Sequence, residues 1–182
     1  MKRLLTILAG AALAASFAGC KKNDQAPGPA PLVVGMDLSY PPFETINEQG
    51  KPAGISVDLA HALGEYLHCP VRIENMPFTG LIPSLLTGKI DLILSSMTDT
   101  PERRKTIAFS DPYLSIGLAV LAETGSGLKG PADLDQSGRT IAVRQGTTGQ
   151  VWATTHLKQA KVIVLDKESS AVLEVVQEKD AG

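Results

Sequence analysis

The sequence predicts an α/β fold with parallel sheets, because short apolar runs that suit strands alternate along the chain with segments of helical periodicity. Residues 32–95 read strand, helix, strand, helix, strand, and a second cycle begins near residue 117. The 182 residues carry 19 acidic and 17 basic side chains, a formal net charge of −2. An acidic chain without basic clusters argues against nucleic acid as a partner.

Residues 1–20 have the composition of a secretory signal peptide. Basic Lys2 and Arg3 precede an apolar run, and small residues lead to Cys20. The run is shorter than the roughly 20 residues of a membrane-spanning helix. Its end is similar to the lipobox of bacterial lipoproteins, which implies that Cys20 is acylated. Cleavage without lipidation and an uncleaved anchor are the alternatives. With Cys20 lipidated, Cys69 has no disulfide partner.

The segment 21–31 is polar and rich in proline, alanine and glycine, so it is expected to be a flexible tether. The residues after it suffice for one good core or two small ones. In the first cycle, Ile55, Leu59, Leu63, Tyr66 and Leu67 recur at helical spacing and are expected to face the core. The first cycle is predicted to contain strands 32–37, 71–75 and 89–95 and helices 55–67 and 80–88.

The second cycle is expected to end incomplete. In its last helix, Ala171, Val172, Val175 and Val176 are expected to point inward, onto a sheet. A parallel strand should follow that helix, and none does, so the chain is expected to be truncated and poorly stable. The second cycle is predicted to contain strands 117–123, 140–144 and 161–165 and helices 149–159 and 168–179.

Polar and aromatic residues follow several of these strands. In open α/β sheets, ligands bind beyond the carboxyl ends of the strands, so these residues are expected to share one crevice. A helix cap at Thr98 and Asp99, with Pro101 in the first turn, explains some of them but not Ser95, Ser96 and Arg103 together. The residues that follow the strands are Asp37, Tyr40, Phe78, Ser95, Ser96, Thr98, Arg103, Arg144 and Thr148.

The residue types in this crevice suit capture of a carboxylate. The guanidinium of Arg103 can grip a carboxylate with two hydrogen bonds, and backbone N–H groups near Thr98 and Thr148 add donors. Tyr40 and Phe78 can cover the aliphatic part of a small zwitterion. No histidine has metal-ligand spacing and no activated nucleophile is recognisable, so neither a metal, a cofactor nor a catalytic residue is expected.

The stretches "VGMDLSYPPFE", "FTGLIPSLLTGKIDLILSSMTDTPERRKTIAFSDPY" and "VRQGTTG" resemble the periplasmic amino-acid-binding proteins of ABC importers, solute-binding family 3. The resemblance runs from about residue 32 to the end of the chain. It implies a type II periplasmic-binding-protein fold of two lobes with the ligand between them. Lobe 1 would be residues 32–116 and lobe 2, incomplete, residues 117–182.

The resemblance also implies individual roles. Arg103 matches the arginine that holds the ligand carboxylate, and Ser96 and Thr98 match positions that bind the carboxylate and the amino group. Tyr40 and Phe78 match the aromatic walls. The remaining matches are Asp37 and Arg144, facing the ligand side chain, Thr148, a backbone donor of the second lobe, and the adjacent Ser95. The family's aspartate for the ligand ammonium would lie beyond Gly182.

The expected function is that of a monomeric receptor, lipid-anchored in the periplasm or cell envelope, that delivers a polar amino acid to an ABC permease. One alternative is a cyclohexadienyl or arogenate dehydratase built on the same fold, which would need a catalytic acid in the cleft. Another is the ligand-binding module of a larger sensor. Glutamine, glutamate and basic amino acids all remain open as the ligand.

Overall fold

The computed structural model describes residues 28–177. The expected signal peptide, the lipidation site at Cys20 and most of the expected tether lie outside the described residues. Within residues 28–177, none of the helices combines the length and the apolar character that crossing a membrane requires.

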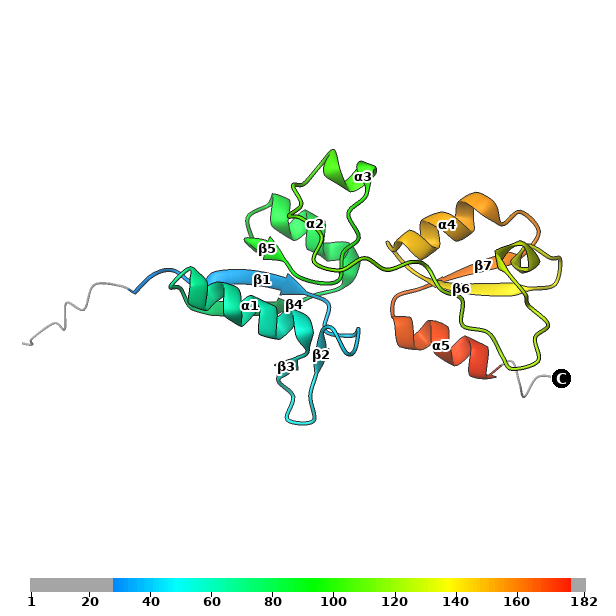
Figure 1. The fold of residues 1–182 in the computed structure, drawn as a ribbon, viewed down its shortest axis with the longest axis horizontal. Coiled ribbons are helices and arrows are strands. Elements are labelled where there is room, and N and C mark those ends of the chain that lie inside the picture. Colours follow the sequence, from blue (N-terminus) through cyan, green and yellow to red (C-terminus); the bar gives the residue numbers. More distant parts are fainter. Residues whose placement is uncertain (1–27, 178–182) are drawn as a thin grey trace, which may run out of the picture.

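Two separate parallel sheets form the framework of the chain. The first has the order β4-β1-β5, from β1 (Leu32–Met36), β4 (Val71–Asn75) and β5 (Leu92–Ile93). The second pairs β6 (Thr140–Arg144) with β7 (Lys161–Leu165). Figure 1 shows the two sheets in two bodies side by side, joined by the extended segment that runs from α3 to β6. The two-lobed α/β fold is therefore confirmed.

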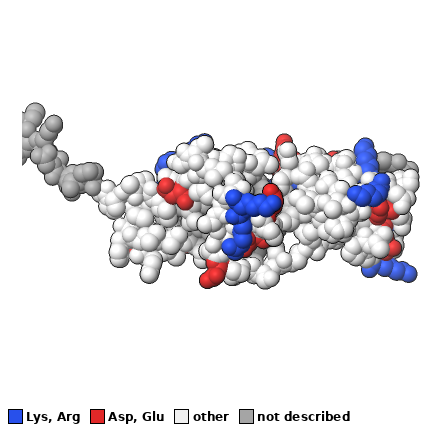
Figure 2. Space-filling model, turned by 90° about the horizontal axis from the view of Figure 1, so that it is seen from above, with Lys and Arg blue, Asp and Glu red and all other residues white. Residues whose placement is uncertain are grey.

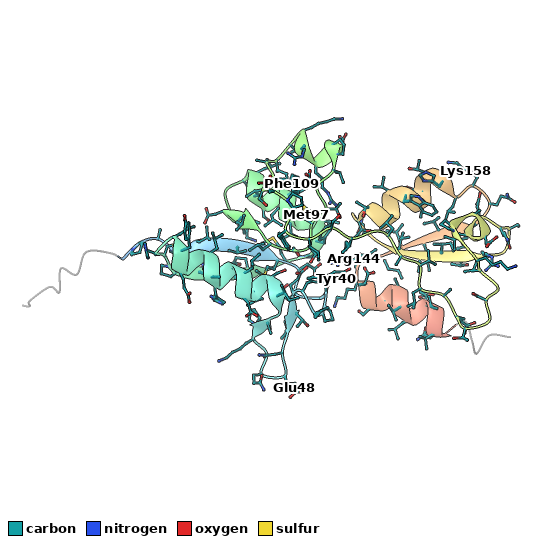
Figure 3. All side chains as sticks on the ribbon, in the orientation of Figure 1. Tyr40, Glu48, Met97, Phe109, Arg144 and Lys158 are labelled. Carbon is teal, nitrogen blue, oxygen red and sulfur yellow. The ribbon has the colours of Figure 1, made fainter. Side chains whose placement is uncertain are left out.

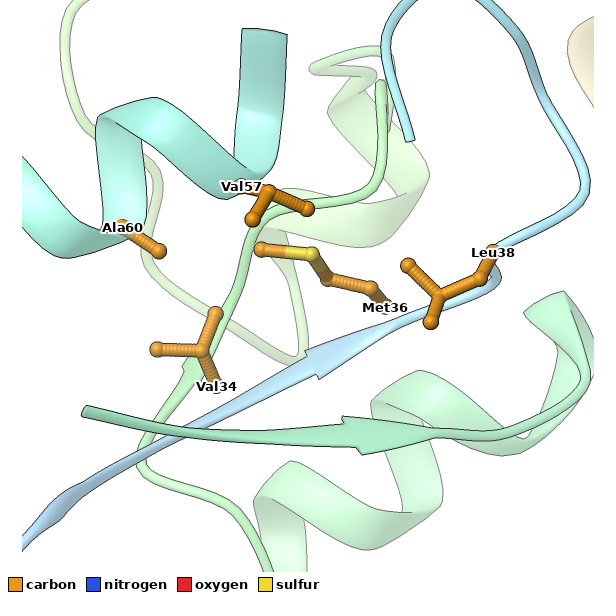
Figure 4. Packing of buried hydrophobic residues seen from close by; sticks show 5 residues of the cluster. All are labelled: Val34, Met36, Leu38, Val57 and Ala60. Atoms are coloured by element: carbon orange, nitrogen blue, oxygen red, sulfur yellow. The ribbon is translucent and has the colours of Figure 1, made fainter. Parts of the chain in front are cut away.

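In the first lobe, helices cover both faces of β1. Helix α1 (Ile55–Tyr66) places Val57 and Ala60 against Val34 and Met36 (Figure 4), while α2 (Phe78–Leu86) lies over the other face. There, a Cβ built on Gly35 would lie 2.4 Å from Ile90 Cδ1 and 3.1 Å from Leu81 Cδ2, so any larger residue would displace these two side chains. A short hairpin (β2, Thr45–Ile46; β3, Pro52–Ala53) and helix α3 (Pro101–Arg104) complete this lobe.

The prediction of which α1 residues face the sheet was wrong. Its buried residues are Ser56, Val57, Ala60 and Gly64, whereas the large residues Ile55, Leu59, Tyr66 and Leu67 are exposed and Leu63 is half-buried. The helix packs closely on β4, since a Cβ on Gly64 would lie 2.3 Å from Val71 Cγ2. Small residues, not large ones, allow that approach.

The second lobe has its own core. Leu134, from the 3₁₀ helix η1 (Pro131–Leu134), packs with Val143, Ala153 and Leu157, and Trp152 lies against this cluster. Helix α4 (Thr148–His156) ends earlier than predicted. The carboxylate of Asp135 explains that end, because its Oδ1 accepts the backbone N–H groups of residues 158, 159 and 160 at 2.7, 2.6 and 3.0 Å.

Two further predictions for the second lobe were wrong. Residues 117–123 form no strand, because no strand among the described residues pairs with this segment. The side chains of Leu118, Val120 and Leu121 are exposed. In α5 (Glu168–Gln177), Ala171 and Val175 are half-buried, but Val172 and Val176 are exposed.

Elements of the first lobe also differ at their ends. The third predicted strand, 89–95, contributes only Leu92 and Ile93 to the sheet as β5. Helix α2 begins two residues before the predicted start, at Phe78, whose N–H donates to the carboxylate of Asp37 at 2.9 Å. A side-chain acceptor at this place stabilises a helix start.

Candidate ligand-binding cleft

A cleft of about 520 Å³ lies between the two lobes. Its walls come from the carboxyl ends of β1, β5 and β6 and from the starts of α2 and α4, as the strand-end rule predicts. Eight of the nine predicted site residues line it, namely Tyr40, Phe78, Ser95, Ser96, Thr98, Arg103, Arg144 and Thr148. The ninth, Asp37, lies behind this lining and pairs with Arg144.

Arg103 is held at the cleft by its own short helix and by both lobes. The hydroxyl of Thr100, rather than the predicted Asp99, caps α3 by accepting the Arg103 N–H at 3.2 Å. The guanidinium donates from Nη1 to the Thr98 carbonyl at 2.6 Å and from Nη2 to the Gly146 carbonyl, in the second lobe, at 2.9 Å. Burial lowers the pKa of Arg103, but a guanidinium remains charged at neutral pH. Both of these acceptors are uncharged.

Asp37 and Arg144 form an ion pair that joins the end of β1 to the end of β6. Their side chains are only 13% and 5% exposed. Asp37 Oδ2 accepts from Arg144 Nη2 and from the Phe78 N–H, and Oδ1 accepts from the Ser39 hydroxyl at 2.6 Å. The Ser95 hydroxyl oxygen accepts the N–H of Asp37 at 2.9 Å, so Ser95 supports this pair.

The ring of Phe78 contacts both guanidinium groups. The Cζ atoms of Arg103 and Arg144 lie 5.5 Å and 5.2 Å from its centroid, within the range of cation–π attraction. On the same lobe, the ring of Tyr40 stacks on Phe43 with centroids 5.8 Å apart. Figure 3 shows Tyr40 and Arg144 close to each other between the two lobes. Aromatic surface and two cations therefore meet in one cleft.

Glu44 is a cleft residue that the sequence reasoning missed. Its side chain is almost fully buried, and Oε2 accepts from the hydroxyls of Ser56 at 2.6 Å and Ser96 at 3.1 Å. Burial raises the pKa of Glu44 more than these hydrogen bonds and the charge of Arg144 lower it. The serine at position 56, on the face that α1 buries, is the sequence signal for a buried polar partner. Ser96 itself has a left-handed backbone, with φ of 49°.

The first turn of α4 forms the second lobe's wall of the cleft, with Thr147, Thr148 and Gly149. Thr147 caps the helix, since its hydroxyl oxygen accepts the N–H of Gln150 at 3.3 Å. The first N–H groups of a helix have no partner within it and lie at the positive end of its dipole. This wall therefore suits an anionic group.

On the outer surface near the cleft, basic side chains lie beside acidic ones. Figure 2 shows Lys and Arg side chains over the middle of the molecule with acidic side chains beside them. Around α3, Arg104 pairs with Asp99, and Lys105 with Glu102 at 2.5 Å. Within residues 28–177, no group of histidine, cysteine, aspartate and glutamate side chains could hold a metal ion.

Residues 32–179 match the model of the bacterial extracellular solute-binding proteins, family 3. The chain belongs to this family. The predicted resemblance is thus confirmed over the part of the chain that holds both sheets and the cleft. Members of family 3 are extracellular proteins, as their description states.

Individual relatives support the same placement. The L-arginine-binding protein of Pseudomonas aeruginosa is 35% identical over 135 residues, which cover 74% of this chain and 52% of that protein. The chain therefore spans about half the length of this relative.

Two solved structures superpose on most of the chain. An ancestral amino-acid-binding protein, described as a precursor of cyclohexadienyl dehydratase, is 37% identical with a TM-score of 0.79, over 81% of this chain and 66% of that one. The structure of holo ArgBP from T. maritima is 40% identical with a TM-score of 0.71, over 81% and 65%.

Proposed function

We propose that this chain is the binding component of an ABC importer, which captures a polar amino acid between its lobes and delivers it to a permease. The observation that carries the proposal is the position of Arg103. Its charged guanidinium reaches into an interlobe cleft, beside an aromatic ring, and donates there to two neutral carbonyls. The relatives named for binding arginine and histidine support the same class of ligand.

The ligand carboxylate would replace the carbonyls of Thr98 and Gly146 as the acceptor for Arg103. A guanidinium and a carboxylate attract each other by charge and can form two parallel hydrogen bonds, which neutral carbonyls cannot match, so this exchange favours binding. The hydroxyl of Thr98 and the backbone N–H of Thr148 complete the anion site, and Ser96 would join it only if its hydroxyl turned from Glu44 to the ligand. Because Gly146 belongs to the second lobe, the exchange also changes one of the contacts between the lobes.

The walls of the cleft would hold the rest of the ligand. Tyr40 and Phe78 cover its aliphatic part and remove apolar surface from water, which is worth about 25 cal/mol per Å². Ser95, in contrast, holds the backbone of Asp37 and acts on the ligand only through it. Residues 32–116 form lobe 1 and residues 117–182 belong to lobe 2 in this proposal.

Glu44 favours a second candidate function, that of a dehydratase. A dehydratase on this fold requires an acid in the cleft, and a buried carboxyl group with a raised pKa is suited to donate a proton. The ancestral neighbour described as a precursor of cyclohexadienyl dehydratase points the same way. We favour binding without catalysis, because the Ser56 and Ser96 hydroxyls already hold Glu44 as part of the lobe. Release of an aromatic acid from prephenate or arogenate would establish the enzyme instead.

We also propose that the chain is a monomer anchored to the membrane through a lipid on Cys20. The support is the order of residues 1–22, a basic start, an apolar run and small residues before the cysteine. An anchor of this kind keeps the receptor close to its permease.

Calorimetric titration with amino acids tests the proposal. The chain should bind at least one polar amino acid and should bind its α-carboxamide much more weakly. Arg103→Ala should reduce affinity by about 30-fold or more, because loss of a buried charge partner costs about 2–5 kcal/mol.

Arg104→Ala is the matched control for that titration. It removes the neighbouring arginine of α3, which pairs with Asp99 and does not line the cleft, and should leave affinity unchanged. Equal losses in the two variants, or none in Arg103→Ala, would refute the assignment.

A further inference from the structure

We propose that Arg144 decides which amino acids this cleft accepts, by blocking cationic side chains and selecting a terminal carboxamide, as in glutamine or asparagine. This inference rests on the proposed function. Its basis is that Arg144 already uses the groups that would attract a ligand cation and also offers one buried donor that has no acceptor.

The Asp37 carboxylate already accepts hydrogen bonds from three groups, and Arg144 balances its charge. One carboxylate oxygen accepts from the Ser39 hydroxyl, and the other accepts from the Phe78 N–H and pairs with Arg144. The pair lies away from solvent, with Arg144 5% exposed. An arginine or lysine ligand would have to displace Arg144 from Asp37, and a buried guanidinium without its partner is strongly unfavourable.

The Phe78 ring, which could attract a ligand cation, already contacts two guanidinium groups. The ring of Phe78 already has the Cζ atoms of Arg103 and Arg144 within 6 Å of its centroid, at 5.5 Å and 5.2 Å. A third cation at this ring would be repelled by Arg103, whose two acceptors are neutral carbonyls, because like charges in a desolvated site are costly.

The other carboxyl groups of the cleft do not restore a cation site. Glu44 is almost fully buried and accepts from two serine hydroxyls, and its raised pKa shows that burial opposes its charge. Glu168 lines the cleft from the start of α5 but is exposed, so water screens it.

Arg144 Nε is the donor that needs an acceptor. It is buried and has no hydrogen-bond partner among residues 28–177. Buried donors are almost always paired in folded proteins, so a ligand oxygen at this point would satisfy it. The ion pair with Asp37 cancels the charge of Arg144, and a ligand carboxylate would therefore be desolvated without a net positive partner. A neutral carboxamide oxygen avoids this cost.

Titration of the full chain with glutamine, glutamate, arginine and lysine tests the inference. The wild type should bind glutamine at least about tenfold more tightly than each of the other three, since an unpaired buried group makes a site selective. Arg144→Met removes the guanidinium, keeps much of its volume and frees Asp37. The ratio of arginine to glutamine affinity should then rise at least about tenfold.

Two further variants separate this effect from general damage. Arg139→Met, in the same lobe, removes an arginine whose side chain donates to Gln136 and does not line the cleft, so the affinity ratios should not change. Adding Asp37→Asn to Arg144→Met should abolish the gain in arginine affinity, because that gain depends on the freed carboxylate.

A wild type that binds arginine, lysine or glutamate as tightly as glutamine overturns this inference and leaves the proposed function in place. An unchanged ratio in a folded Arg144→Met variant also overturns it. If Arg144→Met does not fold, the wild-type ratios decide alone. A folded wild type that binds none of the four amino acids overturns the inference, and one that binds no polar amino acid at all overturns the proposed function as well.

Discussion

Each lobe has a separate hydrophobic core, and this division makes a specific prediction about unfolding. In the first lobe, the core surrounds Met36, and in the second lobe it surrounds Leu134; the side chains are 0% and 1% exposed. Truncation of a fully buried Leu or Met to alanine costs about 2–5 kcal/mol. We expect Met36→Ala and Leu134→Ala to destabilise different lobes by this amount.

Trp152 makes the two lobes distinguishable. It is the single tryptophan of the chain, lies against the core of the second lobe and stacks on His156 with ring centroids 4.9 Å apart. In urea, Trp152 fluorescence should therefore report the second lobe, while far-UV circular dichroism reports both. With a denaturant slope of about 1–3 kcal/mol per molar urea, a loss of about 3 kcal/mol moves a midpoint by roughly 1–3 M.

Leu134→Ala should lower the fluorescence midpoint by that amount, whereas Met36→Ala should leave it nearly unchanged and alter only the dichroism curve. The small residual effect of Met36→Ala would pass through the Asp37–Arg144 pair and the bond from Arg103 to Gly146. Equal shifts of the fluorescence midpoint in the two variants would refute the separation of the cores.

Other predictions concern single residues. Because the pKa of Glu44 is raised in the folded state, its contribution to stability is fully present below the ordinary glutamate value of 4.5 and is lost as pH rises through the folded-state pKa. Glu44→Gln should therefore make the free energy of unfolding less dependent on pH in this range, and an unchanged pH dependence would contradict this account of Glu44. Phe78→Leu should weaken amino-acid binding by roughly 1–3 kcal/mol, measured by calorimetry, through loss of ring contacts to two guanidinium groups. Val176→Lys should change the free energy of unfolding, measured by thermal denaturation, by less than about 0.5 kcal/mol, because this side chain is 58% exposed. A larger loss would indicate that Val176 points inward, as the sequence predicted. Cys20→Ser should move the protein from the membrane to the soluble envelope fraction in cell fractionation, and unchanged membrane association would indicate an uncleaved anchor.

The sequence was sufficient to predict most of the cleft, because its geometry follows from the order of strands and helices. Parallel strands end at one edge, so Tyr40, Phe78, Arg103 and Arg144 meet there although up to 104 positions separate them. The sequence pattern did not predict which charged side chains of the cleft pair with each other. That Asp37 is paired with Arg144 depends on how the two lobes approach each other.

The errors in the fold arise where the outcome depends on a residue's neighbours in space, which the sequence pattern does not contain. Periodicity identifies a helix but does not choose between two faces of the same spacing, and in α1 the small residues Ala60 and Gly64 pack closer to the sheet than Leu59 or Tyr66 would. A strand likewise needs a neighbour to pair with, which the apolar composition of residues 117–123 cannot supply. Glu44 escaped notice because its burial depends on Ser56, twelve positions away on another element.

A crystal structure of the chain grown with glutamine tests the proposed binding site most directly. We expect the amino acid between the lobes, its α-carboxylate on Arg103 in place of the Thr98 and Gly146 carbonyls, and its carboxamide oxygen at Arg144 Nε. The ion pair of Asp37 with Arg144 should remain. Glutamine bound outside this cleft, or bound within it while Arg103 still donates to both carbonyls, would contradict the proposed site.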